Sequence, residues 1–359
     1  MKRMGMLLIP LLVLALLAGS VGCGGEEATP TPVPTAAPTA APTATPTPPP
    51  IELRVSFAYA ESDVRYTTLT KIKDLMEEYT DGRVKLNLFT NAVLFPPATE
   101  WEAITTGAVD MSFTAPYYAS TVDPANMLWY LGGGVWESPE HGWAVLEDGR
   151  VTQIFADKAL ANGVKQLGIF PYSMRQPFIC TEEVIYYKDA AGLKFATGGA
   201  PSPIFQYMEV VPVVMDPSEY YVALAQGTVD SAGPSAISMV LSQKLYEVAD
   251  YCFVHPMGYF AISLWMSPDT WNGLPADIQD IIENKVVPEA LKFSHDYFVE
   301  QEEKDMAELA SHLVALHETQ PADARAAAEA LETNETQKTL LEKVGPEIIN
   351  ILEELRPSS

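Results

Sequence analysis

The sequence predicts an α/β fold in two similar lobes, with long helices at the C-terminal end. The main observation is a phrase that occurs twice, at residues 103–110 (A-I-T-T-G-A-V-D) and 223–230 (A-L-A-Q-G-T-V-D). In both copies, an apolar run and a Pro-containing loop precede a helical stretch, and a short apolar strand and a second Pro-bearing turn follow it. A strand, a crossover helix and a strand in succession are typical of a βαβ unit. Two such units predict two related lobes.

The two copies also predict where a ligand would bind. Gly107 and Gly227 end the predicted helices, because glycine adopts the left-handed conformation of a C-cap without a Cβ clash. Ligands of open α/β sheets bind outside the carboxyl ends of the strands. Two lobes that face each other there would form a cleft. G-x-V-D by itself is a common way to end a helix and begin a strand, so the prediction depends on the matched flanks.

Composition and charge narrow the function classes. The chain has 359 residues, of which 48% are hydrophobic, enough for one large domain or two ordinary ones. A net charge of −25 argues against a nucleic-acid partner, which requires a basic surface. No CxxC motif or Cys/His cluster occurs, which argues against a structural zinc site. We predict no metal site and no cofactor. Outside the cytoplasm Cys180 and Cys252 could form a disulfide or remain two buried thiols.

Residues 1–23 have the pattern of a secretory signal peptide. Two basic residues precede an apolar run at residues 6–18, and small residues lead to Cys23. The run is short for a membrane-spanning helix. Gly22-Cys23 resembles a bacterial lipoprotein signal, in which the cysteine receives the lipid, although Ser20 stands where leucine is usual. Ordinary cleavage or a retained anchor are the alternatives.

The next segment, residues 24–50, consists largely of Pro, Thr and Ala. This composition is typical of an extended, semi-rigid spacer without a core. After a lipid anchor, such a tether would hold a folded domain away from the membrane. No later stretch reaches transmembrane length, so we expect an extracytoplasmic protein, lipid-anchored through Cys23 to the bacterial cell membrane (periplasm or outer face).

The remaining elements follow from hydrophobic periodicity, with a period of two for strands and 3.6 for helices. Strands are predicted at residues 51–58, 84–89, 111–113, 164–170, 178–187, 193–196, 210–215, 231–232, 251–254 and 259–266. Helices are predicted at residues 63–79, 138–160, 203–208, 235–248, 274–312, 322–331 and 337–355, besides those of the repeated phrase. Residues 171–177 would carry the chain to the other lobe, and residues 259–266 would bring it back. The C-terminal helices carry too many charges to act on a membrane, so we expect them to brace the lobes.

The motifs together resemble the DctP-like solute-binding proteins of tripartite ATP-independent periplasmic (TRAP) transporters. The resemblance covers residues 51–282, and the order and spacing of its motifs make it specific, although each motif alone is weak. The motifs are residues 103–113 (A-I-x-x-G-x-V-D-M-S-F), 163–168 leading to Arg175, 191–195 (A-G-L-K-F), 218–224, 227–230, 244–248 and 270–275.

The resemblance implies a two-lobed, periplasmic-binding-protein-like (Venus flytrap) fold that closes around a small organic solute. It implies a receptor that delivers this solute to a large and a small membrane subunit, and not an enzyme. The implied division is a signal peptide (1–23), a linker (24–50), lobe I (51–173), lobe II (174–258), and a crossover strand with C-terminal helices that brace both lobes (259–359).

The predicted cleft departs from the family pattern in its polar clamps. Typical members bind a carboxylate through an arginine just after G-L-K-x, where this chain has Ala196. Alanine cannot replace the bidentate fork of a guanidinium. The second arginine of the family matches Arg175, which we take as the candidate anion contact, with a salt bridge or an interlobe link as the alternative. Simple C4-dicarboxylates are therefore expected to bind weakly or not at all.

Ligand sites are commonly apolar with a few placed polar groups. The aromatic candidates are Tyr59, Phe95, Tyr117, Trp136 and Tyr172, and the polar candidates are Arg175, Thr197, Asp216 and Ser235. For each aromatic residue alone, ordinary core packing is the alternative. Asp216 has the alternative of a helix N-cap ahead of Pro217.

Two other functions remain open, a ligand-sensing lipoprotein and a secreted hydrolase or lyase on the same frame. No G-x-S-x-G motif occurs, and none of the five histidines belongs to a nucleophile motif. His312 and His317 are five residues apart, which is not the i,i+4 spacing of a helical metal pair. The solute receptor of a TRAP-type transporter is therefore the preferred interpretation.

Overall fold

The computed structural model describes residues 48–132, 134–198, 202–233 and 236–357. Residues 48–359 form one compact unit. The predicted signal peptide, the lipidation candidate Cys23 and the linker up to residue 47 lie outside the described residues, as does Ser235.

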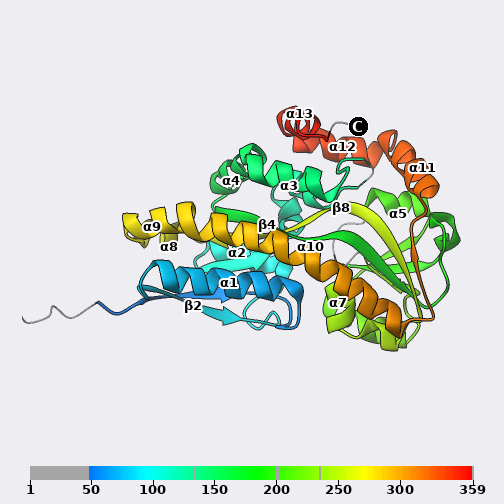
Figure 1. Ribbon diagram of the computed structural model, residues 1–359, viewed down its shortest axis with the longest axis horizontal. Coiled ribbons are helices and arrows are strands. Elements are labelled where there is room, and N and C mark those ends of the chain that lie inside the picture. Colours follow the sequence, from blue (N-terminus) through cyan, green and yellow to red (C-terminus); the bar gives the residue numbers. More distant parts are fainter. Residues whose placement is uncertain (1–47, 133, 199–201, 234–235, 358–359) are drawn as a thin grey trace, which may run out of the picture. The chain divides into compact units, whose positions relative to one another are not determined.

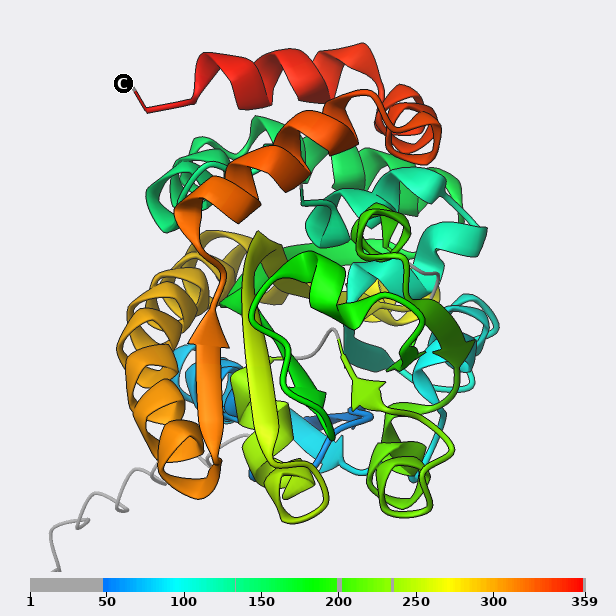
Figure 2. The ribbon, with the colours of Figure 1, turned by 90° about the vertical axis from the view of Figure 1, so that its right-hand side faces the viewer.

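The described residues build one nine-stranded sheet, in the order β2-β1-β3-β8-β4-β7-β5-β6, with β9 pairing with β8. Figure 2 shows β9 (orange) lying beside β8 (yellow-green). The strands are β1 (Ile51–Ser56), β2 (Val84–Phe89), β3 (Met111–Thr114), β4 (Lys165–Cys180), β5 (Lys194–Thr197), β6 (Val211–Val214), β7 (Ser231–Ala232), β8 (Tyr251–Met266) and β9 (Ala315–Glu318).

Two 16-residue strands, β4 and β8, join the halves of the sheet (Figure 1). They are antiparallel from the pair Lys165–Met266 to the pair Cys180–Tyr251, and their register shifts on both sides of Ser173. Such bulges bend and twist a strand. One end of the β4–β8 ribbon pairs with β3 and the other end with β7. The predicted passage at residues 171–177 is thus the middle of β4.

Two βαβ units of equal topology lie on either side of this ribbon. The first unit is β1, α1 (Val64–Tyr79), β2, α2 (Pro97–Thr105) and β3, and the second unit is β5, α5 (Pro203–Met208), β6, α6 (Tyr220–Ala225) and β7. Their strand orders are β2-β1-β3 and β6-β5-β7. Gly107 and Gly227 have φ angles of 69° and 65°, so both end their helices in the left-handed region. The two-lobed α/β fold is confirmed.

Several predicted helices are shorter than expected because glycine and proline interrupt them. Residues 138–160 form two helices, which Gly149 separates with a φ of 81°. Residues 337–355 likewise divide at Gly345-Pro346. The additional helices are α3 (Pro139–Asp148), α4 (Arg150–Ala161), α7 (Ile237–Ser242), α8 (Pro268–Gly273), α9 (Ala276–Ile281), a π-helical turn (Ile282–Val286), α10 (Val287–His312), α11 (Pro321–Glu332), α12 (Glu335–Val344) and α13 (Pro346–Glu354). Short 3-10 helices span Pro116–Thr121, Pro124–Tyr130, Tyr187–Ala190, Pro217–Glu219 and Leu245–Glu247.

The longest helix, α10, contacts α1 of the first unit, the joining strand β4, and α7 beyond the second unit (Figure 1). It therefore packs against helices beside both halves of the described sheet and against the ribbon between them. None of the helices in the described part of the chain combines the length and apolar character needed to cross a membrane.

The predicted strand at residues 178–187 ends early, at Cys180. The Asp189 carboxylate accepts hydrogen bonds from the backbone N–H groups of Ile185 (3.1 Å) and Tyr186 (2.8 Å). This side chain satisfies donors that a strand would pair with its neighbour, and it begins a 3-10 helix at Tyr187.

The two described cysteines are free thiols in the core. Cys180 pairs across the ladder with Tyr251, and Cys252 with Ile179, so the two positions differ by one residue in register. Successive side chains of a strand point to opposite faces. The two sulfurs therefore belong to different apolar clusters, and no disulfide joins them.

Candidate functional site

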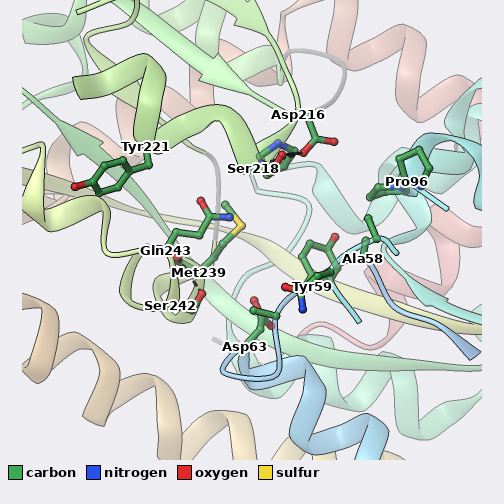
Figure 3. A pocket seen from close by; sticks show the side chains of 15 residues that line it. Ala58, Tyr59, Asp63, Pro96, Asp216, Ser218, Tyr221, Met239, Ser242 and Gln243 are labelled. Carbon is green, nitrogen blue, oxygen red and sulfur yellow. Dashed lines mark hydrogen bonds between the residues drawn. The ribbon is translucent and has the colours of Figure 1, made fainter. Parts of the chain in front are cut away.

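An open cavity of about 560 Å³ lies between the two βαβ units, at the carboxyl ends of β1, β2 and β6 (Figure 3). Figure 3 shows Ala58, Tyr59, Asp63 and Pro96 facing Asp216 and Ser218 across this space. The described residues that line this outer cavity are Ala58, Tyr59, Ala60, Asp63, Asn91, Ala92, Pro96, Pro97, Asp216, Pro217, Ser218, Tyr221, Met239, Ser242 and Gln243. This is the edge at which ligands of open α/β sheets bind.

A smaller inner cavity of about 20 Å³ adjoins the outer one and shares Tyr59, Pro217 and Met239 with it. Most of its wall is aromatic, with Tyr117 4.3 Å from Tyr118 and 5.0 Å from Tyr130 between ring centroids. The described lining consists of Tyr59, Arg65, Tyr117, Tyr130, Tyr172, Gly198, Pro217, Tyr220, Ala236, Met239 and Phe260. Both βαβ units and both joining strands contribute to this wall.

Arg65 is the charged side chain of the inner cavity. It stands in the first turn of α1, two residues after the N-cap Asp63, and is 3% exposed. Its Nε donates to Asp63 Oδ1 (2.7 Å) and its Nη2 to Asp63 Oδ2 (2.6 Å). The guanidinium carbon lies 3.4 Å from the ring centroid of Tyr59 and 4.8 Å from that of Tyr172. Although burial opposes its charge, Asp63 and Tyr59 raise the pKa of Arg65, so the group stays charged.

The tyrosines of this region are neutral hydrogen-bonding groups. Burial raises the pKa of Tyr59, Tyr117, Tyr118 and Tyr220 well above the usual value, because a phenolate loses its hydration there. The Tyr59 hydroxyl is buried and has no hydrogen-bond partner among the described residues. A ligand group in the inner cavity could supply that partner.

Several predicted site residues line the cavities. Tyr117 and Tyr172 line the inner cavity, and Tyr59 lines both. Asp216 lines the outer cavity. It also caps the 3-10 helix that begins at Pro217, because its carboxylate accepts a hydrogen bond from Ser218 N at 2.9 Å. A position at the cavity and a role as N-cap are therefore compatible.

Thr197 is fully buried at the end of β5, next to the lining residue Gly198. It lies beside Tyr130, where burial raises the pKa of the phenol and the Thr197 hydroxyl lowers it. Thr197 therefore supports the cavity wall from behind.

Three predicted residues lie elsewhere. Trp136 is in a core cluster, where it stacks on Trp129 and donates from Nε1 to Leu128 O (3.2 Å). Phe95 packs against the cluster around Trp265 and lines neither cavity. The bulge in β4 directs Arg175 to α10, where Nη1 pairs with Glu303 Oε1 at 2.7 Å. Arg175 therefore forms a salt bridge, which was the alternative to its predicted role as an anion contact.

Sequence reasoning missed Arg65, Tyr118, Tyr130, Tyr220 and Phe260. The pattern Asp63-x-Arg65 predicts only the start of a helix, since Asp is a preferred N-cap. Its burial depends on Tyr172, more than 100 residues away in the chain, which no local pattern reveals.

The family comparison agrees with this geometry. Residues 55–339 match the sequence profile of DctP, described as bacterial extracellular solute-binding protein, family 7. The chain belongs to this family. Its members are solute-binding receptors, which places the described domain outside the cytoplasm.

The relatives found by sequence have low identity to this chain, but the alignments cover most of both proteins. An uncharacterized protein of Haemophilus influenzae is 27% identical over 312 residues, covering 85% of this chain and 92% of that protein. The C4-dicarboxylate-binding periplasmic protein DctP of Rhodobacter capsulatus is 24% identical over 310 residues, covering 84% of this chain and 89% of that protein.

Solved structures show the same fold. A TRAP periplasmic solute-binding protein of Desulfovibrio salexigens, with bound orotic acid, has a TM-score of 0.77 at 19% identity, covering 85% of this chain and 98% of the other. A Shewanella oneidensis protein with bound succinate has a TM-score of 0.76 at 21% identity, covering 86% and 100%. The DctP-like TRAP receptor fold expected from the sequence is thus confirmed.

Proposed function

We propose that this receptor captures one small organic solute in the outer and inner cavities and passes it to the membrane subunits of a TRAP transporter. The observation that carries the proposal is a cavity bounded by both βαβ units, with a buried, oriented Arg65 and neutral phenols at its inner end. A few fixed polar groups in an aromatic wall are typical of small-molecule sites.

The proposed binding residues are those that line the two cavities. They include Tyr59, Tyr117, Tyr172 and Asp216 from the sequence-based set, together with Arg65, Tyr130 and Tyr220. Thr197 acts as a support, and Ser235 is a further candidate in the residue pair 234–235, which borders the lining residue Ala236 in the sequence. The charged anchor is assigned to Arg65 and not to Arg175, because Arg175 is engaged by Glu303 on α10.

Binding without chemical conversion is the activity we propose. The described lining of the cavities contains no histidine or cysteine, so it offers neither an imidazole base nor a thiol nucleophile. Relatives bind small organic acids: the Shewanella oneidensis protein holds succinate, and a sugar-acid-binding protein of Advenella mimigardefordensis holds galactonate.

The remaining parts of the chain fit delivery at a membrane. We propose the division made from the sequence: a lipoprotein-type signal peptide (1–23), a tether (24–50), lobe I (51–173), lobe II (174–258), and a crossover and bracing region (259–359). The strand β4 runs from lobe I into lobe II, β8 runs from lobe II into the crossover region and pairs with β3 of lobe I, and α10 contacts elements of each lobe, as a hinge between them requires. Lipidation at Cys23 would keep the receptor close to its transporter.

The test combines detection of a solute with a variant that fills the cavity. Native mass spectrometry of freshly purified protein is expected to show a co-purified small molecule, and a metabolite screen by thermal shift should identify compounds that stabilise the fold. A ligand at a hundredfold excess over its Kd adds about 2.7 kcal/mol to the free energy of unfolding.

The substitution Ala60→Trp should abolish this stabilisation, because Ala60 is half-buried and lines the outer cavity. The matched control is Val222→Trp, at a position that is 53% exposed and lines neither cavity. Equal binding by both variants, or no bound solute in the wild type, would contradict the proposal.

A further inference from the structure

The Arg65 guanidinium binds Asp63 through Nε and Nη2, and its other amino group, Nη1, lies outside this ion pair. A guanidinium can meet a carboxylate through Nε and Nη2 or through Nη1 and Nη2. Asp63 occupies the first edge, with both oxygens within 2.7 Å. Nη1 takes no part in the Asp63 pair, and Arg65 lines the inner cavity. The Tyr172 phenol also hydrogen-bonds to the guanidinium. Beside this phenol, the second edge can receive one carboxylate of a ligand.

The fixed orientation of this group points to ligand binding. Asp63 holds it from the side, and Tyr59 and Tyr172 lie 3.4 Å and 4.8 Å from its central carbon. A buried ion pair contributes little net stability, because the cost of desolvation offsets the attraction. The same contacts do preorganise the guanidinium, which reduces the entropy lost when a ligand binds.

The charges around the cavities restrict the ligand further. Among the described residues that line either cavity, the charged ones are Asp63, Asp216 and Arg65, which sum to one negative charge. Residues 199–201 and 234–235 carry no charged side chains. The surrounding phenols are neutral. A dicarboxylate would add two negative charges where a single arginine, already paired, is the positive group.

We propose that the receptor selects a zwitterionic ligand, with one carboxylate for the Arg65 edge and one ammonium group for the side of Asp63 and Asp216. An amino acid or an N-substituted amino acid has this chemistry. The carboxylate meets the guanidinium fork, and the ammonium group balances the excess negative charge. This inference rests on the proposed function and specifies its ligand class.

Three probes with the same five-carbon chain test the charge requirement. Norvaline is a zwitterion, valerate a monoanion and glutarate a dianion, so calorimetry on the wild type compares charge at nearly constant size. Norvaline is expected to bind most tightly and glutarate most weakly, with about a tenfold difference in Kd or more, since norvaline alone adds a charged hydrogen-bond pair to the carboxylate contact. Tighter binding of valerate or glutarate than of norvaline would overturn the inference.

Two variants separate recognition from a structural role. Arg65→Lys keeps the charge but loses the fork, so norvaline should bind about tenfold more weakly or worse. Asp63→Asn keeps an N-cap side chain and leaves Arg65 with its full charge. Valerate should then bind more tightly, and the preference for norvaline over valerate should fall about tenfold. A merely structural pair would change stability without changing this preference.

The chain supplies a matched control in Arg54 and Asp110. This pair has the same side-on geometry, with Nε 2.9 Å and Nη2 3.2 Å from the carboxylate oxygens, but lines neither cavity. Asp110→Asn should leave the norvaline-to-valerate ratio unchanged.

The outcomes distinguish the inference from the proposed function. A wild type that binds no compound in a screen of amino acids, their deaminated analogues and dicarboxylates, and that carries no co-purified solute, contradicts the receptor function itself. A bound or co-purified solute that lacks an ammonium group leaves the receptor function standing and overturns the zwitterion assignment. An equal change of the probe preference in Asp63→Asn and Asp110→Asn also overturns the zwitterion assignment and leaves the receptor function standing.

Discussion

The first and second βαβ units share one frame, down to individual hydrogen bonds. Asp110 accepts from the backbone N–H of Arg54 and Asp230 from that of Lys194, each at 2.8 Å. In the first unit Val55 pairs with Met111, and in the second Phe195 pairs with Ser231 at the equivalent place. The aspartate that closes each repeated phrase thus ties its third strand to the first strand of its unit.

Inside this frame, the two units are filled differently. In the first unit, the buried Glu100 of α2 accepts from Ser56 (2.7 Å) and Ser112 (2.8 Å). The equivalent positions of the second unit are Tyr220 on α6, Ala196 on β5 and Ala232 on β7. These three residues are buried together in one apolar cluster. A carboxylate among hydroxyls in one unit corresponds to a phenol among methyl groups in the other.

The difference explains the composition of the cleft. Position 196, where the family resemblance leads us to expect an arginine, is the counterpart of Ser56. The small Ala196 packs in the same cluster as Tyr220, which lines the inner cavity. The second unit therefore contributes the Tyr220 phenol to the aromatic wall, and the positive group comes from Arg65 on α1 of the first unit. A duplicated frame permits this exchange, because it leaves the packing positions free to vary.

The largest expected effect concerns the phenol of the second unit. Tyr220→Ala should lower the free energy of unfolding by about 3–5 kcal/mol, because it removes a side chain that is 1% exposed and leaves a cavity in its place. Urea titration followed by fluorescence measures this loss. Tyr221→Ala, on the same helix but only half-buried, is the control and should cost less than about 1.5 kcal/mol. Similar losses in both variants would show that Tyr220 does not hold the second unit together.

The carboxylate of the first unit predicts a pH dependence. Burial raises the pKa of Glu100 from 4.5 to about 7, although the surrounding hydroxyls lower it. Because the folded state holds this proton more tightly than the unfolded state, the stabilisation is present at low pH and is lost as the pH rises from 4.5 to about 7. Glu100→Gln should remove that slope.

Above that range, the Glu100→Gln variant should be more stable than the wild type by up to about 3 kcal/mol, since one pKa unit corresponds to 1.36 kcal/mol. Thermal unfolding at a series of pH values measures both effects. Glu102→Gln, an exposed neighbour on α2, should change neither slope nor stability appreciably. An unchanged slope in Glu100→Gln would assign the pH dependence to other groups.

The two units share their backbone topology but differ in their buried side chains, and the same contrast shows what local sequence patterns can predict. The helix-ending glycines and strand periods depend on neighbouring residues, so Gly107, Gly227 and the order of elements followed from the sequence. The burial of Arg65 depends on Tyr172, which only the folded chain brings near. Likewise, motif matching found Arg175 but could not show that a bulge in β4 directs it to Glu303.

Trp136 and Phe95 illustrate the same limit for apolar residues. A large aromatic side chain suits a core and a cleft equally well, so its type and spacing do not decide between them. Trp136 stacks on Trp129 in the core, whereas Tyr117 packs in a tilted arrangement against Tyr130 at the inner cavity. A buried phenol can both donate and accept a hydrogen bond, whereas an indole N–H can only donate, and this favours tyrosine over tryptophan where a ligand supplies the partner.

The smallest expected effects test the shared frame itself. Asp110→Asn and Asp230→Asn should each cost about 1 kcal/mol, because each weakens an equivalent hydrogen bond between two strands. Asp110→Asn should cost a few tenths of a kcal/mol more, since Asp110 also pairs with the Arg54 guanidinium, whose side chain is 45% exposed. That surplus should disappear in high salt, which screens exposed ion pairs, while the shared part should remain. Urea titrations at low and high salt separate the two contributions. If one aspartate proves dispensable while the other does not, the two phrases have the same geometry without the same energetic role.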